Sequence, residues 1–142
     1  MTLDVNVLVA TFRQDHPHHY IARQWLLQAL QEVDENPIYL VPFVLSSFLR
    51  IVSNKRVFVN PSTIEEAWNF LNVLQSIEGV QHIILGEEWA TFQKLCLENN
   101  AKANDIPDIW LASVSIQYNQ CLVSFDADFL KFLPANKFLH LI

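Results

Sequence analysis

The fold is decided at Met1-Thr2-Leu3-Asp4-Val5-Asn6, where an acid is placed inside an apolar run that continues through Val7-Leu8-Val9-Ala10. An ionised carboxylate is costly to bury unless a hydrogen-bonded partner or a bound cation offsets its desolvation. Only Met1 to Leu3 precede Asp4, so a strand here is short and Asp4 lies near its carboxyl end. We therefore expect the partners of Asp4 to come from later parts of the chain.

The composition is that of a globular protein with a core of its own. The chain has 142 residues, of which 51% are hydrophobic, and no linker, repeat or low-complexity tract divides it. We expect one domain spanning residues 1–142. The longest apolar runs are far shorter than the roughly 18 to 20 residues of a membrane span, and no basic region precedes an apolar signal segment. These features predict a cytoplasmic protein without a membrane partner.

The net charge of -6 argues against the sequence-blind nucleic-acid binding of a basic domain, but it permits a small basic patch beside an acidic site. Cys96 and Cys121 lie in apolar segments without the spacing of metal ligands, which favours buried reduced thiols. Three histidines lie between Arg13 and His19, but Pro17 breaks any helical pairing there. A solvated loop is the favoured interpretation.

Hydrophobic periodicity predicts strands that alternate with helices. A capping box of Ser62 and Glu65 starts one of the helices and places Trp68 on its buried side, and Trp89 faces the core from the next helix. Val5 to Phe12 can extend the first strand or begin a helix, because so short a run has no decisive period. Helices are expected over residues 18–33, 43–53, 62–76, 87–99 and 105–118, and strands over residues 1–4, 38–41, 80–85, 121–125 and 138–142.

The alternation of strands and helices predicts a parallel sheet covered on both faces, with all strand carboxyl ends at one edge. Sites in open sheets of this kind form along that edge. Asp4 and Asp126 both follow strands, and Asp108 lies in the first turn of the helix that leads into the last central strand, where Asp105 can cap and Pro107 suits the first turn. Carboxylates that are far apart in sequence can therefore converge.

Each of these acids also has a purely structural explanation. Asp108 can complement the positive end of its helix. Asp126 or Asp128 can shape a turn or cap a short helix. No turn or cap accounts for Asp4 in the sequence, so we do not expect all of these acids to be incidental.

Four segments carry a resemblance to a known family. They are Asp4-Val5-Asn6-Val7-Leu8, Phe48-Leu49-Arg50-Ile51-Val52-Ser53-Asn54, Ile106-Pro107-Asp108 and Ser124-Phe125-Asp126-Ala127-Asp128-Phe129. In this order and spacing the chain resembles the PIN-domain toxins of the VapC type over nearly its whole length. The resemblance implies an α/β fold, a three-layer α/β/α sandwich around a mainly parallel sheet, with a helical turn after Asp4.

The resemblance further implies a magnesium- or manganese-dependent endoribonuclease that cuts RNA. Such a protein is the toxin of a type II toxin-antitoxin pair, is usually a homodimer, and is silenced by an antitoxin whose tail blocks the site. In this sequence Asp4, Asp108 and Asp126 match the metal-binding catalytic acids of the family. Asn6 and Ser124 match its polar supporting positions.

The match has one departure from the family pattern. Asp128 takes the place of a more variable fourth acid, but Ser47 or Ser46 stands where many PIN domains have a glutamate. Weaker metal binding or a single bound ion would follow from that loss. Our hypothesis is that Asp4, Asp108, Asp126 and Asp128 suffice.

The residue types suit the implied chemistry. Hard divalent ions prefer carboxylate oxygens, and such an ion can activate a bound water and offset the charge that builds on a phosphate. Arg50, Lys55 and Arg56 form the densest basic region and are candidates for holding RNA phosphates. Basic residues at a helix end also commonly meet only solvent or the helix dipole.

Other classes of function fit less well. A phosphatase of the haloacid dehalogenase type needs a second aspartate two residues after Asp4, where this chain has Asn6. A receiver domain needs paired acids at the first strand, and a serine hydrolase needs a G-x-S-x-G elbow, which is absent. The remaining alternative is a catalytically weak PIN-like module that acts by sequestering a partner.

Overall fold

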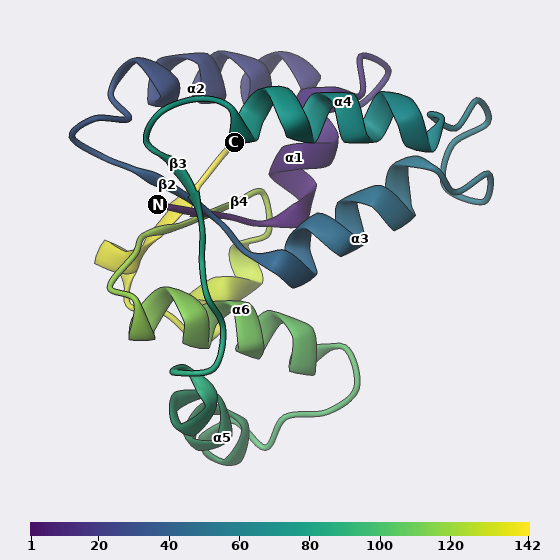
Figure 1. Cartoon of the computed structure of the whole chain (residues 1–142). Coiled ribbons are helices and arrows are strands. Elements are labelled where there is room, and N and C mark those ends of the chain that lie inside the picture. The colour runs from purple at the N-terminus through teal and green to yellow at the C-terminus, as the bar shows by residue number, and fades with distance from the viewer.

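A five-stranded parallel sheet lies between two layers of helices, as the computed structural model of residues 1–142 shows (Figure 1). The strand order is β3-β2-β1-β4-β5, so β1 occupies the centre although it comes first in the chain. Thr2 pairs with Tyr39 on one side and with Leu122 on the other. This arrangement confirms the predicted α/β class. The strands are β1 (Thr2–Leu3), β2 (Ile38–Leu40), β3 (Val80–His82), β4 (Leu122–Ser124) and β5 (Phe138–His140).

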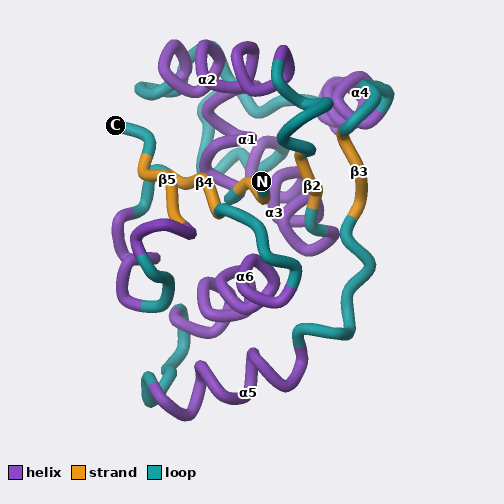
Figure 2. The backbone as a smooth tube through the Cα atoms, turned by 90° about the vertical axis from the view of Figure 1, so that its left-hand side faces the viewer, coloured by secondary structure: helices purple, strands orange, loops and turns teal.

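The helices cover both faces of the sheet. Seen along the sheet, α1, α2 and α4 lie on one side and α5 and α6 on the other (Figure 2). Not one helix in the chain combines the length and the apolar character that a bilayer-spanning segment requires. The helices are α1 (Val5–Phe12), α2 (His19–Gln31), α3 (Pro42–Val52), α4 (Ile64–Gln75), α5 (Trp89–Glu98) and α6 (Asp105–Gln117), with short 3-10 helices η1 (Ala127–Lys131) and η2 (Ala135–Lys137).

The apolar run after Asp4 forms helix α1, which the residues alone left open and the family resemblance favoured. Val7 and Leu8 on this helix are almost completely buried. Burial of such side chains contributes about 1.5–3 kcal/mol each, enough together to offset a cost of several kcal/mol for desolvating a nearby carboxylate. The stretch thus packs the centre of the fold while carrying an acid at its start.

Several local predictions are wrong. One helix cap is displaced by one residue, and Trp68 lies on the exposed face of its helix and not on the buried face. The capping box uses Thr63 and Glu66, each accepting a hydrogen bond at 3.1 Å from the other's backbone N–H. Ser62 is instead buried and accepts a hydrogen bond from Arg13. Trp68 is 46% exposed, because it lies one residue beyond the buried Ala67 and each helical residue turns the side chain by about 100°.

Helix α5 departs most from the prediction. Trp89 is 62% exposed, and no residue of α5 is buried. The helix packs on the outer side of α6, away from the sheet, so its apolar face covers another helix and not the core (Figure 2). Cys96 on α5 and Cys121 before β4 are free thiols, as expected, but they are only half-buried.

Two boundaries at the functional edge also differ. The expected strand over residues 80–85 ends at His82, and the chain then runs as a loop to α5. Asp105 does not cap α6, because it is the first residue of the helix and Asn104 holds the cap position without a side-chain bond. The Asp105 carboxylate instead accepts the backbone N–H of Lys102 at 3.2 Å.

Candidate active site

Asp4 joins the end of the central strand β1 to the start of α1. Its backbone N–H donates to the Val123 carbonyl at 3.0 Å, which fixes it beside β4. One carboxylate oxygen, Oδ1, accepts the Val5 N–H at 2.7 Å, so Asp4 is the N-cap of α1. The other, Oδ2, accepts the Ser124 hydroxyl at 2.6 Å. Asp4 is only 8% exposed, and each of its oxygens keeps a lone pair for a further partner.

Ser124 and Asn6 form a polar network that supports Asp4. While the Ser124 hydroxyl donates to Asp4, its oxygen accepts the Asn6 amide at 3.0 Å and the Asp126 N–H at 2.9 Å. The Asn6 Oδ1 accepts the Phe125 N–H at 3.2 Å. Ser124 is fully buried, so solvent does not compete for its hydroxyl at the centre of the network. The two predicted supporting residues therefore hold the loop after β4 against the start of α1.

Asp126 and Asp128 lie at the start of the short helix η1. The Asp126 Oδ1 accepts the Asp128 N–H at 2.9 Å, which makes Asp126 the N-cap of η1. Asp128 is exposed and pairs with the Lys131 ammonium at 2.9 Å. The turn-shaping role foreseen for Asp126 is therefore real, and it leaves the second carboxylate oxygen without a hydrogen bond inside the chain.

The negative charges of the other acids act on the Asp108 carboxylate. Burial is the largest cause of its raised pKa, and together with the negative charges of Asp4, Asp126, Asp105 and Asp128 it raises that pKa to about 6. The pKa of Asp4 is also raised, mainly by burial and slightly by Asp126, against the lowering effect of its hydrogen bonds from Ser124 and Val5. The structure thus brings together charges from the ends of β1 and β4 and the start of α6.

Asp105 is the acid that sequence reasoning placed in a different role. It was expected to cap α6, yet it contributes to the field that raises the pKa of Asp108. The signal was present in the spacing, since residues three apart on a helix lie on the same face. No glutamate acts on Asp108, in agreement with serine at positions 46 and 47, of which Ser46 is exposed and Ser47 half-buried.

The donor chemistry of this edge fits a hard divalent cation. The side chains do not form a ready ligand cage, because no three His, Cys, Asp or Glu side chains are placed to hold one ion together. Electrostatic interactions act over longer distances than metal–ligand bonds. The acids can therefore affect one another's pKa values without all contacting one ion. Mg²⁺ keeps several waters and binds through one or two carboxylates, which suits separated aspartates better than a closed cage.

The three predicted phosphate-binding residues lie on one stretch of surface. Arg50 is in the last turn of α3, and Lys55 and Arg56 lie in the loop that follows; all three are exposed and none forms an ion pair within the chain. The residues next to them, Ile51 and Val57, line a cavity together with Asn6. The basic stretch therefore lies near the polar network, although no contact joins it to the acids.

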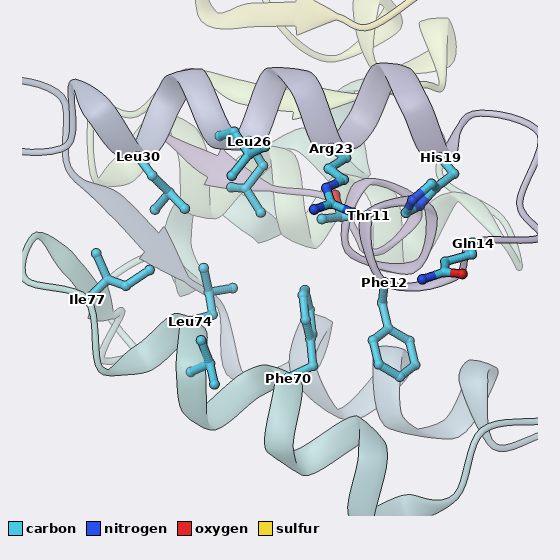
Figure 3. A pocket seen from close by; sticks show the side chains of 12 residues that line it. Thr11, Phe12, Gln14, His19, Arg23, Leu26, Leu30, Phe70, Leu74 and Ile77 are labelled. Carbon is cyan, nitrogen blue, oxygen red and sulfur yellow. The ribbon is translucent and has the colours of Figure 1, made fainter.

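A separate apolar groove lies between α2 and α4, away from the acids (Figure 3). It has a volume of about 250 Å³ and carries no carboxylate. Arg23 and His19 lie at one end of it. Its apolar lining includes Leu26, Leu30, Phe70, Leu74 and Ile77.

Comparison with known proteins identifies the family and agrees with the fold. Residues 1–132 match the model of the PIN domain. Among curated proteins, ribonuclease VapC25 of Mycobacterium tuberculosis is 34% identical over 137 residues, covering 92% of this chain and 91% of the relative. Ribonuclease VapC31 of the same species is 36% identical with the same coverage.

Solved structures show the same fold at low sequence identity. VapBC2 from Rickettsia felis, solved with a DNA fragment from its promoter, gives a TM-score of 0.67 at 16% identity and covers 99% of this chain and 98% of its own. Mycobacterium tuberculosis VapC20, a sarcin-ricin loop cleaving toxin, gives 0.63 at 16% identity and covers 93% and 95%. Fold, motif order and sequence identity all agree, and the chain belongs to the PIN-domain family, in the branch of the VapC ribonucleases.

Proposed function

We propose that this ribonuclease is a magnesium- or manganese-dependent endoribonuclease and the toxin of a type II toxin-antitoxin pair. The observation that carries the proposal is the acidic edge of the sheet. Burial and four neighbouring carboxylates raise the pKa of Asp108 to about 6, while the one nearby ammonium, on Lys131, is paired with Asp128. Such an edge repels an RNA phosphate unless a cation offsets the acids.

In this proposal Asp4, Asp108 and Asp126 hold the metal. When bound, a divalent cation lowers the pKa of a water ligand and offsets the charge of the phosphate under attack. The hydroxyl of Ser124 keeps the Asp4 carboxylate in one orientation, and the Asn6 amide fixes Ser124. These bonds hold Asp4 and Ser124 in one arrangement before a metal binds, because Ser124 is fully buried.

Asp128 and the basic residues have weaker support. Asp128 contributes negative charge but is already paired with Lys131. Arg50, Lys55 and Arg56 carry unpaired charges on an otherwise acidic protein, and we assign them to the RNA backbone. We also propose a homodimer and an inhibitory antitoxin, as expected for a VapC-type protein.

The second candidate function is a PIN-like module that binds a partner without cutting RNA. One observation favours it: the acids form no ready ligand cage, and no glutamate joins them. The two candidates differ in the effect of removing a single charge at the sheet edge. This change lowers the rate of RNA cleavage by a nuclease, whereas a binding module cleaves no RNA with or without the charge.

The deciding experiment is cleavage of a mixed RNA pool by the purified protein with MgCl₂ or MnCl₂. We expect EDTA, Asp4→Asn and Asp126→Asn each to lower the rate at least about 100-fold, which corresponds to about 3 kcal/mol of transition-state stabilisation. Asparagine keeps the capping oxygen and removes only the charge. Asp34→Asn is the matched control, because Asp34 is exposed in the loop before β2, at the opposite end of the strands.

Two results would separate the candidates. If RNA is cut in a metal-dependent way and the two site variants fail, the nuclease is supported. If no RNA is cut and Asp126→Asn still arrests growth when expressed in cells, the binding module is supported instead. Light scattering of the purified chain tests the homodimer in the same preparation.

A further inference from the structure

A second cavity opens directly beside the acidic edge, between α1 and the loop that joins α3 to α4. Its volume is about 290 Å³, close to the lower end of the range of about 300–1,000 Å³ for small-ligand sites. It is adjacent to the acids because Val5 and Asn6, which follow Asp4 in the chain, form part of its wall. The apolar lining consists of Val5, Val9, Ile51, Val57 and Phe58.

The aromatic wall of this cavity is held in place from outside. The guanidinium carbon of Arg13 lies 4.2 Å from the centre of the Phe58 ring, while Arg13 itself does not line the cavity. Arg13 is fixed in turn by hydrogen bonds to Ser62 at 2.9 Å and to Asp15 at 2.6 and 2.9 Å. These hydrogen bonds hold Arg13 in place, and its cation lies over one face of the Phe58 ring. Phe58 therefore has little freedom to move, and this wall of the cavity is preformed.

One polar group in the cavity has an unused donor. The His16 Nδ1 accepts the His18 backbone N–H at 3.1 Å, so Nε2 carries the proton of the neutral ring. Burial and the neighbouring His18 lower the pKa of His16, which keeps this ring neutral at pH 7. Nε2 makes no hydrogen bond within the chain, and it is available to a ligand acceptor.

Aromatic rings connect this cavity to the acidic edge. The centres of the His16 and His18 rings are 5.7 Å apart. His18 stacks on Phe125, with centres 4.7 Å apart and planes 12° from parallel. Phe125 immediately precedes Asp126. A row of aromatic rings therefore lies between a ligand in the cavity and the acids.

The rim of the cavity is basic although the protein is acidic. Lys55 and Arg56 immediately precede Val57 and Phe58 in the same exposed loop, and neither forms an ion pair. A chain of net charge -6 thus places unpaired cations next to an apolar cavity. Cations beside flat apolar walls are the combination that single-stranded RNA uses, with phosphates on the charges and a base in the pocket.

We propose that this cavity binds one unstacked nucleobase of the RNA, next to the phosphate to be cut, and that it sets the nucleotide preference of cleavage. The apolar walls and Phe58 receive the flat faces of the base, and the His16 Nε2–H donates to an acceptor on its edge. The inference rests on the proposed ribonuclease function. The basic rim favours RNA over a protein tail as the occupant.

The test compares a filled cavity with an unchanged one. Val57→Trp places a large ring into the cavity from an exposed loop, and Val59→Trp makes the same change two residues on, at a side chain that is 95% exposed and outside the lining. His16→Phe keeps an aromatic ring and removes the Nε2–H donor, together with the acceptor of the His18 N–H. His82→Phe is its control on the edge strand β3. Thermal unfolding checks that each variant is folded.

The first measurement maps cleavage of a random-sequence single-stranded RNA pool. We expect the wild type to prefer one or two bases at a fixed position beside the cut. Val57→Trp should reduce that preference about tenfold, at the low end of what a stacked base contributes. His16→Phe should lose discrimination between bases with and without an edge acceptor, and both control variants should match the wild type.

The second measurement does not depend on cutting. In the Asp126→Asn background, fluorescence anisotropy compares short RNAs that each carry one abasic nucleotide at a different position. We expect one position at which the abasic site weakens binding about tenfold, and we expect Val57→Trp to remove that difference. This arm decides whether the cavity binds a nucleobase, even if the wild type cuts no RNA and the nuclease function fails.

Several results would overturn the inference while leaving the nuclease intact. One is a wild-type base preference that persists in both Val57→Trp and His16→Phe. Another is equal binding of all the abasic RNAs. A third is a Val57→Trp variant that escapes a co-expressed antitoxin but keeps the wild-type base preference, which would assign the cavity to the protein partner.

Discussion

Asp4 uses one carboxylate for two purposes. Its Oδ1 caps α1, and its Oδ2 is held by Ser124 at the edge where the other acids lie. The positive end of a helix and two hydrogen bonds offset part of the cost of burying the charge, but burial still outweighs them, because the pKa of Asp4 is raised. Sequence reasoning missed this cap because a cap is defined by backbone angles, which an apolar sequence pattern does not reveal.

The hydroxyl of Ser124 is the most shared group of the site. Replacing Ser124 with alanine leaves Asp4, Asn6 and the Asp126 N–H each without one partner. We expect Ser124→Ala to lower the free energy of unfolding by about 2–3 kcal/mol, since buried polar groups without partners cost about 1–3 kcal/mol. Activity should fall about 10- to 100-fold, as for other groups that orient metal ligands.

Ser113 offers a matched control for this prediction. It is equally buried, but its hydroxyl only donates to the Ile109 carbonyl in its own helix. Chemical denaturation should show a loss of no more than about 1 kcal/mol for Ser113→Ala, with activity unchanged. Equal losses for the two variants would contradict the network role of Ser124.

Asp108 makes the stability of the metal-free protein depend on pH. Its folded pKa of about 6 lies above the ordinary value of 3.8, so the folded state binds more protons between these values and stability falls as pH rises through them. Two pKa units correspond to about 3 kcal/mol, which we discount to about 1 kcal/mol because Asp108 is half-exposed and solvent screens its charge.

Removal of this charge should therefore stabilise the protein above pH 6. With EDTA present, we expect Asp108→Asn to raise the melting temperature by about 3 °C at pH 7.5. The gain should disappear at pH 4, where the wild-type side chain is largely protonated. Thermal unfolding monitored by circular dichroism measures both, with Asp34→Asn as the control. An equal gain at both pH values would show that charge is not the cause.

The acids of the site were predictable from sequence for a simple physical reason. Parallel strands with right-handed crossovers bring their carboxyl ends to one edge, so Asp4 and Asp126 were placed by topology alone. Asp108 followed from its position in the first turn of a helix. The strength of its coupling to Asp105 was not predictable, because it depends on burial that only the packed structure defines.

At the scale of elements, Glu88 fixes the path from the sheet to α5. Its side chain is almost fully buried and accepts hydrogen bonds from the Gly86 N–H at 2.7 Å and the Trp110 Nε1–H at 3.0 Å. The Tyr118 hydroxyl, which donates to the Ile84 carbonyl at 2.6 Å, lies 3.5 Å from the same carboxylate. Burial alone would raise the pKa of Glu88, but these donors outweigh it and lower the pKa. Glu88, at the N-cap position of α5, thus ties the start of this helix to Trp110 of α6.

We expect Glu88→Ala to lower the free energy of unfolding by about 2–3 kcal/mol at pH 7, because the Gly86 and Trp110 donors lose their acceptor. Glu87→Ala, at the exposed neighbouring residue, should change it by less than about 0.5 kcal/mol. Hydrogen exchange should also speed up across α5.

Because the folded pKa of Glu88 is lowered, its stabilisation is present above pH 4.5 and is lost as pH falls through the folded value. A difference that persisted unchanged at pH 2.5 would contradict this account.

The element predictions failed where packing decides between equivalent faces. The sequence pattern placed Trp89 in the core because apolar spacing cannot tell a helix on the sheet from a helix on another helix. The Trp110 ring of α6 stacks on Phe43 at 4.3 Å and also meets Trp89 and Phe92 of α5. The apolar face of α5 is therefore real, but α6 covers it.

At the scale of the whole molecule, the apolar groove between α2 and α4 is lined by none of the acids of the sheet edge (Figure 3). Leu27 and Val73 line it and are exposed, so the groove presents apolar side chains to solvent. Arg23 lies in the same groove and forms no ion pair. An amphipathic antitoxin segment with an acidic residue would cover the apolar wall and pair with Arg23.

If the proposed antitoxin docks there, Val73→Glu should weaken its binding at least about 30-fold, or about 2 kcal/mol, because a buried unpaired charge is introduced. Stability should change little, since Val73 is already exposed in the free chain. Arg23→Glu should have a similar effect on binding through charge alone, whereas Val59→Glu, outside the groove, should have none.

Calorimetry with the antitoxin measures the affinity, and cleavage of RNA by each variant serves as the control, because the groove contains none of the acids. Wild-type affinity in Val73→Glu and Arg23→Glu would place the antitoxin elsewhere, whereas loss of RNA cleavage in either variant would mean that the groove and the acidic edge are not independent.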